Sequence, residues 1–146
     1  IRRFIKDDGI FCQWVHLYDM DIPLVASIMK AVSANFQDYI VYFTNDTNIV
    51  ILAANQKLPS QPAETIFTIP TVKSELAHIG VYNVQDLLVR KVGTREILDP
   101  LFQSYHIPAN SDYYPVLDTG AARARYLARS AKDLNRLRAF WISGNS

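Results

Sequence analysis

The chain has 146 residues, of which 49% are hydrophobic and 20% are charged, a composition typical of one globular domain rather than a disordered chain. Its formal net charge of +1 excludes the strongly basic footprint of a dedicated nucleic-acid binder. Residues 1–70 carry five Lys and Arg against seven Asp and Glu, whereas residues 71–146 carry ten against seven. Cys12 is the only cysteine, so no internal disulfide can form, and its apolar surroundings predict a packed thiol in a reducing compartment.

No apolar run approaches the roughly 18 residues that a membrane-spanning helix needs, and the chain shows no signal peptide. We therefore expect a cytoplasmic protein, or the soluble part of a membrane-anchored parent whose membrane segments lie elsewhere. The chain begins at Ile1 within an apparent helix, which suggests a piece of a longer protein.

The first strand is predicted over residues 10–18, which are apolar or aromatic on both faces, as in a strand covered on both sides. Asp8-Gly9 before it supplies a turn that ends a helix, because glycine adopts positive φ without a Cβ clash. Asp19 and Asp21 follow the strand. In open α/β sheets ligands bind beyond the carboxyl ends of the strands, so these acids mark a candidate site.

Pro23 suits the first turn of a helix, and apolar residues at helical spacing extend this helix over about 22–36. Residues 39–44 and 49–54 are rich in β-branched, aromatic and apolar side chains, and the turn sequence Asn-Asp-Thr-Asn separates them. This arrangement predicts a β-hairpin. Residues 57–70 are predicted to be a linker, because Pro59 and Pro62 interrupt the chain near its start.

Mostly helices are predicted after the linker. Thr71 begins one that ends near residue 78, and Asn83 caps a second that Gly93 closes. Thr94 begins a third, although Pro100 disfavours it because a proline inside a helix costs about 3 kcal/mol, and a start at Asp99 is the alternative.

The last part of the chain combines an extended segment with a basic helix. Residues 110–118 are polar and aromatic, and Pro115 favours an extended backbone. The final helix is predicted over about 121–141, with apolar residues at heptad spacing and Lys and Arg on its other positions. The basic face could bind phosphate, anionic lipid or RNA, but a solvated helix face is the commoner meaning of such charges.

Two stretches resemble the C-terminal part of the spermidine synthase-like proteins, a family of aminopropyltransferase homologues. The first is Gly9-Ile10-Phe11-Cys12-Gln13-Trp14 through Tyr18, followed by the helix and the hairpin of residues 38–55. The second, Asn110-Ser111-Asp112 to Pro115-Val116-Leu117, looks like the family's Thr-Asp-Asp-x-Pro-x-Leu stretch, with Tyr113 in place of the second acid. The resemblance implies a Rossmann-like fold that binds decarboxylated S-adenosylmethionine and transfers its aminopropyl group to a polyamine.

The chain departs from this family in two motifs. It lacks the Gly-rich loop that seats the nucleoside and the Asp-x-x-Asp-Pro segment that supplies the base, so we expect neither a catalytic residue nor a cofactor site in it. The expected fold is α/β: a truncated Rossmann-like mixed sheet ending in an antiparallel hairpin over residues 1–56, the linker 57–70 and a mostly helical subdomain over 71–146.

The resemblance also predicts how the strands pair. Residues 49–54 should lie between residues 39–44 and residues 10–18, which leaves the other edge of 10–18 without a neighbour. Because an open apolar edge invites pairing with another chain, we expect self-association there, or coverage by the C-terminal helices.

Gln13 is the first candidate for a substrate-binding residue. It is the only polar side chain between Ile10 and Val15, and the resemblance implies that this glutamine reaches toward the amine; the alternative is a buried amide satisfied by backbone. Asp19, Tyr18 and Trp14 complete the predicted substrate-binding set, because an acid and ring faces suit a cationic aliphatic chain. Their alternatives are a helix cap and core packing.

Other residues favour structural interpretations. Asp21 precedes a helix and is better explained as its cap. Tyr42 could line an amine pocket, but a strand aromatic is by default a core residue. The three histidines have no ligand partners at metal-binding spacing, so no metal site is predicted.

Three functions follow, in order of preference. The chain is the C-terminal part of a spermidine synthase-like protein that supplies one wall of a polyamine pocket, or it is a non-catalytic interaction or oligomerisation domain. Nucleic-acid binding through the basic helix ranks last, and no nucleic-acid partner is expected. The reading frame upstream of Ile1 separates the first two, because only the first requires a Gly-rich loop and an acidic motif there.

Overall fold

The computed structural model describes residues 4–18, 20–126 and 134 and shows a mixed α/β fold. Its centre is a four-stranded antiparallel sheet in the order β1-β3-β2-β4. The elements in chain order are β1 Ile10–His16, α1 Ile22–Asn35, β2 Asp38–Asn45, β3 Asn48–Ala54, the 3-10 helix η2 Glu64–Thr68, α2 Pro70–His78, α3 Val84–Leu88, β4 Lys91–Thr94, α4 Arg95–Gln103 and α5 Val116–Tyr126.

The predicted pairing of the strands is confirmed. β3 lies between β1 and β2 and is antiparallel to both, with Gln13 opposite Ile51 and Val41 opposite Ile51 on the other side. Ile51 is therefore in the middle of the sheet, and it is fully buried.

The helix predicted over 22–36 is also confirmed, as α1. Its N-cap is Asp21, whose carboxylate accepts a hydrogen bond from the Leu24 amide at 3.2 Å, and a proline occupies its first turn. The predicted capping role of Asp21 is thus correct.

The second half of the chain contains a strand that the sequence analysis did not predict. The helix begun by Asn83 stops at Leu88 instead of running on to Gly93, and residues 91–94 form β4. β4 pairs antiparallel with β2, and Val92 is buried in the main core. The open backbone edge of β2 explains this difference, because it offers ladder hydrogen bonds that local propensity cannot anticipate.

The helix after β4 begins where Thr94 predicted, as α4, and it continues through Pro100. Proline at its sixth position removes the bond from its own nitrogen to the Glu96 carbonyl, and its ring crowds that carbonyl. Burial of Leu98 and Phe102 in the same core as α1 compensates for that loss. The Arg95 guanidinium further ties α4 to the end of α1 by donating to the Phe36 and Gln37 carbonyls.

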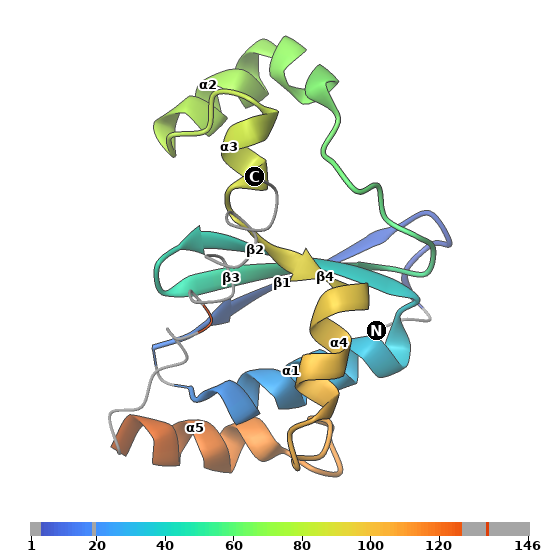
Figure 1. Ribbon diagram of the computed structural model, residues 1–146, viewed down its shortest axis with the longest axis vertical. Coiled ribbons are helices and arrows are strands. Elements are labelled where there is room, and N and C mark those ends of the chain that lie inside the picture. Colours follow the sequence, from blue (N-terminus) through green and yellow to red (C-terminus); the bar gives the residue numbers. More distant parts are fainter. Residues whose placement is uncertain (1–3, 19, 127–133, 135–146) are drawn as a thin grey trace.

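The helices are unevenly distributed over the two faces of the sheet. In Figure 1, α1 and α5 lie on one side of the sheet, and α2 and α3 lie beyond the other. The buried apolar cluster joins α1, α4 and the strands on the α1 side. We call the opposite side of the sheet the open face. Among the helices of the described ranges, none is long and apolar enough to cross a membrane.

The C-terminal prediction overlaps the described residues only in part. α5 begins at Val116, earlier than the predicted helix start near 121, so the end of the segment expected to be extended is helical. Most of the basic helix predicted over 121–141 lies outside the described residues. Leu134 is described, and it is buried in the main core.

Gly80 ends α2 with a φ of +71°, which a side chain with a Cβ adopts at a cost. Its amide bonds to the Ala77 carbonyl, and the Val81 amide bonds to the Leu76 carbonyl, as in a Schellman cap. We expect Gly80→Ala to lower the free energy of unfolding by about 1–2 kcal/mol in urea denaturation. The cost is conformational, because a Cβ there meets only the Arg90 guanidinium at 3.9 Å. Gly80→Asn, which tolerates positive φ, should lose less; equal losses would contradict this explanation.

Candidate functional site

A cavity of about 450 Å3 lies between β1, α1 and the segment that precedes α5. We call it the β1–α1 cavity. It joins the two stretches that carry the family resemblance, which are separated by about a hundred positions in the sequence. Its lining residues are Phe11, Gln13, Val15, Ile28, Ala31, Val32, Asn35, Phe36, Asn110, Ser111, Asp112 and Leu117.

Gln13 lines this cavity from the middle of β1, and its side chain is exposed rather than buried. Its amide nitrogen donates to the Trp14 carbonyl at 2.8 Å. The amide oxygen makes no hydrogen bond within the described part of the chain and can accept one. The alternative that Gln13 is a buried amide is therefore wrong, because its side chain is exposed. The hydrogen bond to backbone that this alternative also predicted is present.

The segment that carries the second motif is fastened to α1 by buried and half-buried polar groups. The Lys30 ammonium donates to the Tyr105 carbonyl at 2.7 Å and to the Ile107 carbonyl at 2.9 Å. The Ser27 hydroxyl, which is fully buried, donates to the Pro108 carbonyl at 2.6 Å. We call these three hydrogen bonds the α1 tether. The residues that come next in the chain, Asn110 to Asp112, line the β1–α1 cavity.

Backbone and side-chain bonds then fix the motif itself. The Asn110 amide donates to the Ser27 carbonyl at 3.0 Å, and the Asn110 side-chain oxygen accepts from the Leu117 amide at 3.2 Å. The Ser111 hydroxyl accepts from the Tyr114 amide. Asp112 is exposed, and its carboxylate has no hydrogen bond or ion pair with the described residues. Tyr113, in the place of the family's second acid, is 93% exposed and does not line the cavity.

The cavity combines apolar walls with a few oxygen acceptors. Phe11 and Phe36 stack with ring centroids 5.2 Å apart and planes inclined by 11°. The Asp112 carboxylate and the side-chain amide oxygens of Gln13 and Asn35 have no hydrogen-bond partner among the described residues. An apolar wall suits methylene groups, and a carboxylate with an amide oxygen suits an ammonium group. The arrangement can hold one cationic end of an aliphatic chain.

The other predicted site residues lie elsewhere. Trp14 and Tyr18 flank His16, with ring centroids 3.8 Å and 4.7 Å from the His16 ring. Since alternate strand residues point to opposite faces, this aromatic row lies on the open face, across the sheet from Gln13. Asp19 lies outside the described residues. Gln13 therefore does not share a pocket with Trp14 and Tyr18.

The open face carries a second hollow, an apolar groove of about 650 Å3 bounded by the sheet, the 58–63 linker and residues near α2 and α3. Tyr42 lines it, and burial raises the pKa of this phenol. Cys12 also belongs to the open face, and it is exposed. The prediction of a packed thiol is wrong, because the strand was expected to be covered on both sides. Trp14 and Tyr18, expected by default to be core, are about half exposed for the same reason.

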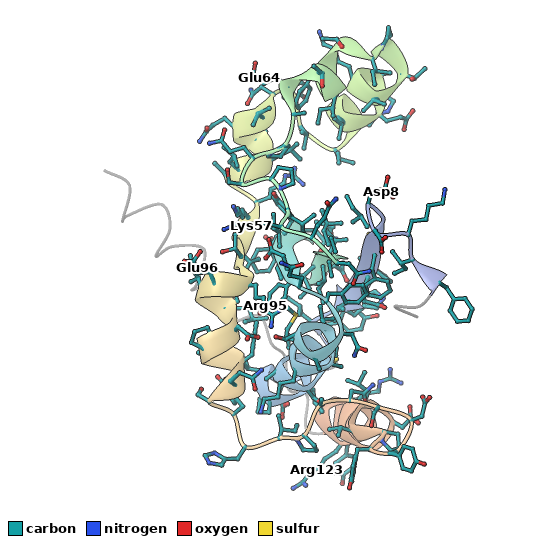
Figure 2. The ribbon with its side chains drawn as sticks, turned by 90° about the vertical axis from the view of Figure 1, so that its right-hand side faces the viewer. Asp8, Lys57, Glu64, Arg95, Glu96 and Arg123 are labelled. Atoms are coloured by element: carbon teal, nitrogen blue, oxygen red, sulfur yellow. The ribbon has the colours of Figure 1, made fainter. Side chains whose placement is uncertain are left out.

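A third hollow of about 560 Å3, lined mostly by polar residues, lies where β2 meets α4. Figure 2 shows Lys57, Arg95 and Glu96 gathered near the start of α4, and all three line this hollow. Beneath it, Tyr39 is fully buried, and burial, followed by the charge of nearby Asp99, raises the pKa of its phenol. Side chains of both charge signs line the third hollow, so it favours neither a cation nor an anion as its ligand.

Comparisons with protein-family models, with curated proteins and with solved structures found no match to this chain. Among the described residues, no three His, Cys, Asp or Glu side chains lie close enough together to hold a metal ion.

The sequence analysis missed the α1 tether. The one local indication of the tether is Ser27, a small polar residue with apolar neighbours in the predicted helix. Nothing near Lys30 in the sequence marks its acceptors, because they lie 75 and 77 residues away.

Proposed function

We propose that this chain is the C-terminal part of a spermidine synthase-like aminopropyltransferase, in which it forms one wall of the polyamine pocket. The observation that supports this is the convergence of Gln13 with Asn110, Ser111 and Asp112 on the β1–α1 cavity. The resemblance rested on these two stretches separately, and their proximity is an independent property of the fold.

The strand order is compatible with the proposal. A hairpin whose last strand inserts between its two predecessors is what the resemblance implies for the end of a truncated Rossmann-like sheet. β4 is an addition at the far edge.

In this proposal the chain supplies groups that bind the amine. Decarboxylated S-adenosylmethionine would be the co-substrate of the intact parent, and its nucleoside loop is not part of this sequence. Asp112 would pair with an ammonium group, Gln13 would accept a hydrogen bond from it, and Phe11 and Phe36 would pack against methylene groups.

The test is equilibrium binding of putrescine and spermidine to the intact parent and to its Gln13→Ala and Asp112→Asn variants. We expect Asp112→Asn to weaken binding about tenfold or more, because a charge-assisted hydrogen bond contributes about 1.5–3 kcal/mol. Gln13→Ala should weaken it less, by about fivefold, since a neutral hydrogen bond contributes about 1 kcal/mol.

Gln103→Ala is the control, because Gln103 is exposed on α4 and does not line the cavity. Asn45→Ala would not serve, because the Asn45 side chain organises the β2–β3 turn. Unchanged affinity in both site variants would remove the β1–α1 cavity from the amine site.

The second candidate is a non-catalytic interaction or oligomerisation domain. It is favoured by a specific observation, the exposed apolar character of the open face and of β1, where Ile10 and Trp14 are 58% and 50% exposed. The absence of a Gly-rich loop and an acidic motif in the upstream reading frame would favour this candidate over the first.

A further inference from the structure

The apolar groove on the open face is walled by three separate parts of the described chain. Its floor is the sheet, one wall is the linker segment 58–63, and the other wall comes from residues between the end of α2 and the turn after α3. Figure 1 shows the linker rising from the sheet to the helices above it. The volume of about 650 Å3 lies in the range of small-molecule sites, roughly 300–1,000 Å3. We call this hollow the linker groove.

Strand alternation gives the linker groove an apolar floor. Ile40 and Tyr42 of β2 and Val50 and Leu52 of β3 line it, and the residues between them belong to the main core on the other face. Both strands are therefore apolar or aromatic on their two faces, which is typical of strands that are covered on both sides.

Two side chains of the sheet hold the linker in place. The Asp38 carboxylate accepts a hydrogen bond from the Leu58 amide at 2.9 Å, and the Lys91 ammonium donates to the Ser60 carbonyl at 3.1 Å. Asp38 belongs to β2 and Lys91 to β4, so both anchors come from the sheet that forms the floor. The wall is thus fixed at two points, and the linker groove is a hollow built by the fold rather than a bare sheet face.

Arg90 is the only charged residue among the described residues that line the linker groove. Its guanidinium donates to the Thr44 carbonyl at 3.2 Å and to the Ile79 carbonyl at 2.7 Å, and both of these residues also line the groove. A guanidinium has more N–H donors than these two bonds use. No carboxylate of the described ranges forms an ion pair with Arg90. The described lining therefore presents a positive charge without a counter-ion.

Tyr42 supplies a second donor on the floor of the groove. Its half-buried phenol has no hydrogen-bond partner in the part of the chain that the structure describes, whereas buried phenols usually have one. Burial raises the pKa of Tyr42, so its hydroxyl keeps the proton that it can donate. Tyr42 pairs with Lys91, and the Phe43 amide donates to the Arg90 carbonyl at 2.8 Å. Tyr42 and Arg90 therefore start from neighbouring positions of the sheet.

We infer that the linker groove binds a medium-chain aliphatic carboxylate, whose charged end bonds to Arg90 and the Tyr42 hydroxyl and whose alkyl chain lies on the apolar floor. The unpaired positive charge favours an anion, the two donors suit the two oxygens of one carboxylate, and the apolar lining favours an alkyl chain. The inference does not rest on the proposed function, because the β1–α1 cavity lies on the other face of the sheet.

Isothermal titration calorimetry of the intact protein with decanoate and with 1-decanol tests the inference. Decanoate should bind about tenfold or more tightly than decanol, because only the carboxylate forms charge-assisted hydrogen bonds with the two donors. From hexanoate to decanoate, each added methylene should raise the affinity about fourfold as it leaves water. No binding of decanoate, which would leave the groove to a protein segment, would overturn the inference, and so would equal affinities for decanoate and decanol.

Three variants separate the charged end from the apolar floor. Arg90→Gln should weaken decanoate binding about tenfold or more, and Tyr42→Phe about fivefold or more, while both leave the affinity for decanol unchanged. Lys73→Gln is the matched control, because it removes the same charge from an exposed position of α2 that does not line the groove. Its affinity for decanoate should equal that of the unmodified protein.

Arg90 also joins two walls of the groove, so its substitution can disturb them. In that event Arg90→Gln lowers the affinity for decanoate and decanol alike, and Tyr42→Phe decides, because the phenol holds no described part of the fold. A loss in Tyr42→Phe that is confined to decanoate supports the inference. Unchanged decanoate affinity in Tyr42→Phe, or an equal loss for decanoate in Lys73→Gln and Arg90→Gln, would overturn it.

Discussion

Cutting the α1 tether should lower the free energy of unfolding by about 1–3 kcal/mol for Ser27→Ala and by about 1.5–3 kcal/mol for Lys30→Met. Ser27→Ala removes the hydroxyl that donates to the Pro108 carbonyl. Lys30→Met removes the ammonium that donates to the Tyr105 and Ile107 carbonyls, of which the Tyr105 carbonyl still accepts from the Ile107 amide. These hydrogen bonds are partly shielded from water, so a carbonyl that loses its donor is only partly rehydrated, and the expected loss exceeds that of a surface hydrogen bond. Urea denaturation measures both values.

The tether should also control the position of the second motif. Hydrogen exchange of the Asn110 amide, which bonds to the Ser27 carbonyl, should accelerate in both variants. The matched control is Lys73→Met on α2, where the lysine is exposed, and its effect should stay within about 0.5 kcal/mol. Similar losses for Lys30→Met and Lys73→Met would show that the tether does not stabilise the fold.

Leu98→Ala should lower the free energy of unfolding by about 2–5 kcal/mol. Leu98 is 2% exposed, packs into the main core, and is the side chain that a Cβ on Gly93 would meet at 2.8 Å. Truncation therefore leaves a cavity between β4, α4 and α1. Ile97→Ala is the control on the same helix, because Ile97 is 46% exposed and its loss should be small.

The same experiment tests the division of the chain at residue 70. Val92, Leu98 and Phe102 belong to one buried cluster with α1 and the central strands, so Leu98→Ala should shift a single cooperative transition seen by circular dichroism and by tryptophan fluorescence. Two transitions, of which only one moves, would instead identify residues 71–146 as an independent subdomain.

Much of the first third of the fold follows from local sequence. Pro23 and Asp21 begin α1 for reasons within one helical turn, and the β-branched runs on either side of Asn-Asp-Thr-Asn form the hairpin. The pairing of β3 with both β1 and β2 was predicted from the resemblance rather than from local pattern. Gln13 could be singled out because it is an isolated amide in an apolar strand, and the cavity confirms that it is accessible.

Other features have no local signal. β4 forms because β2 offers an unpaired edge, and the short run Lys-Val-Gly-Thr reads equally well as the end of a helix. The exposure of Cys12 and Trp14 depends on what covers the open face, and the apolar character of β1 suggested a cover on both sides.

By itself, the sequence determined where the chain turns, where α1 to α4 begin and which strand carries the candidate amide, because caps, prolines and alternation act over a few residues. Only the tertiary structure decided which candidates share a site. It placed Gln13 with Asp112 through the contacts of Ser27 and Lys30, and it separated Gln13 from Trp14 by the thickness of the sheet. Those contacts join residues 75–81 positions apart, a range over which no periodicity or turn signal operates.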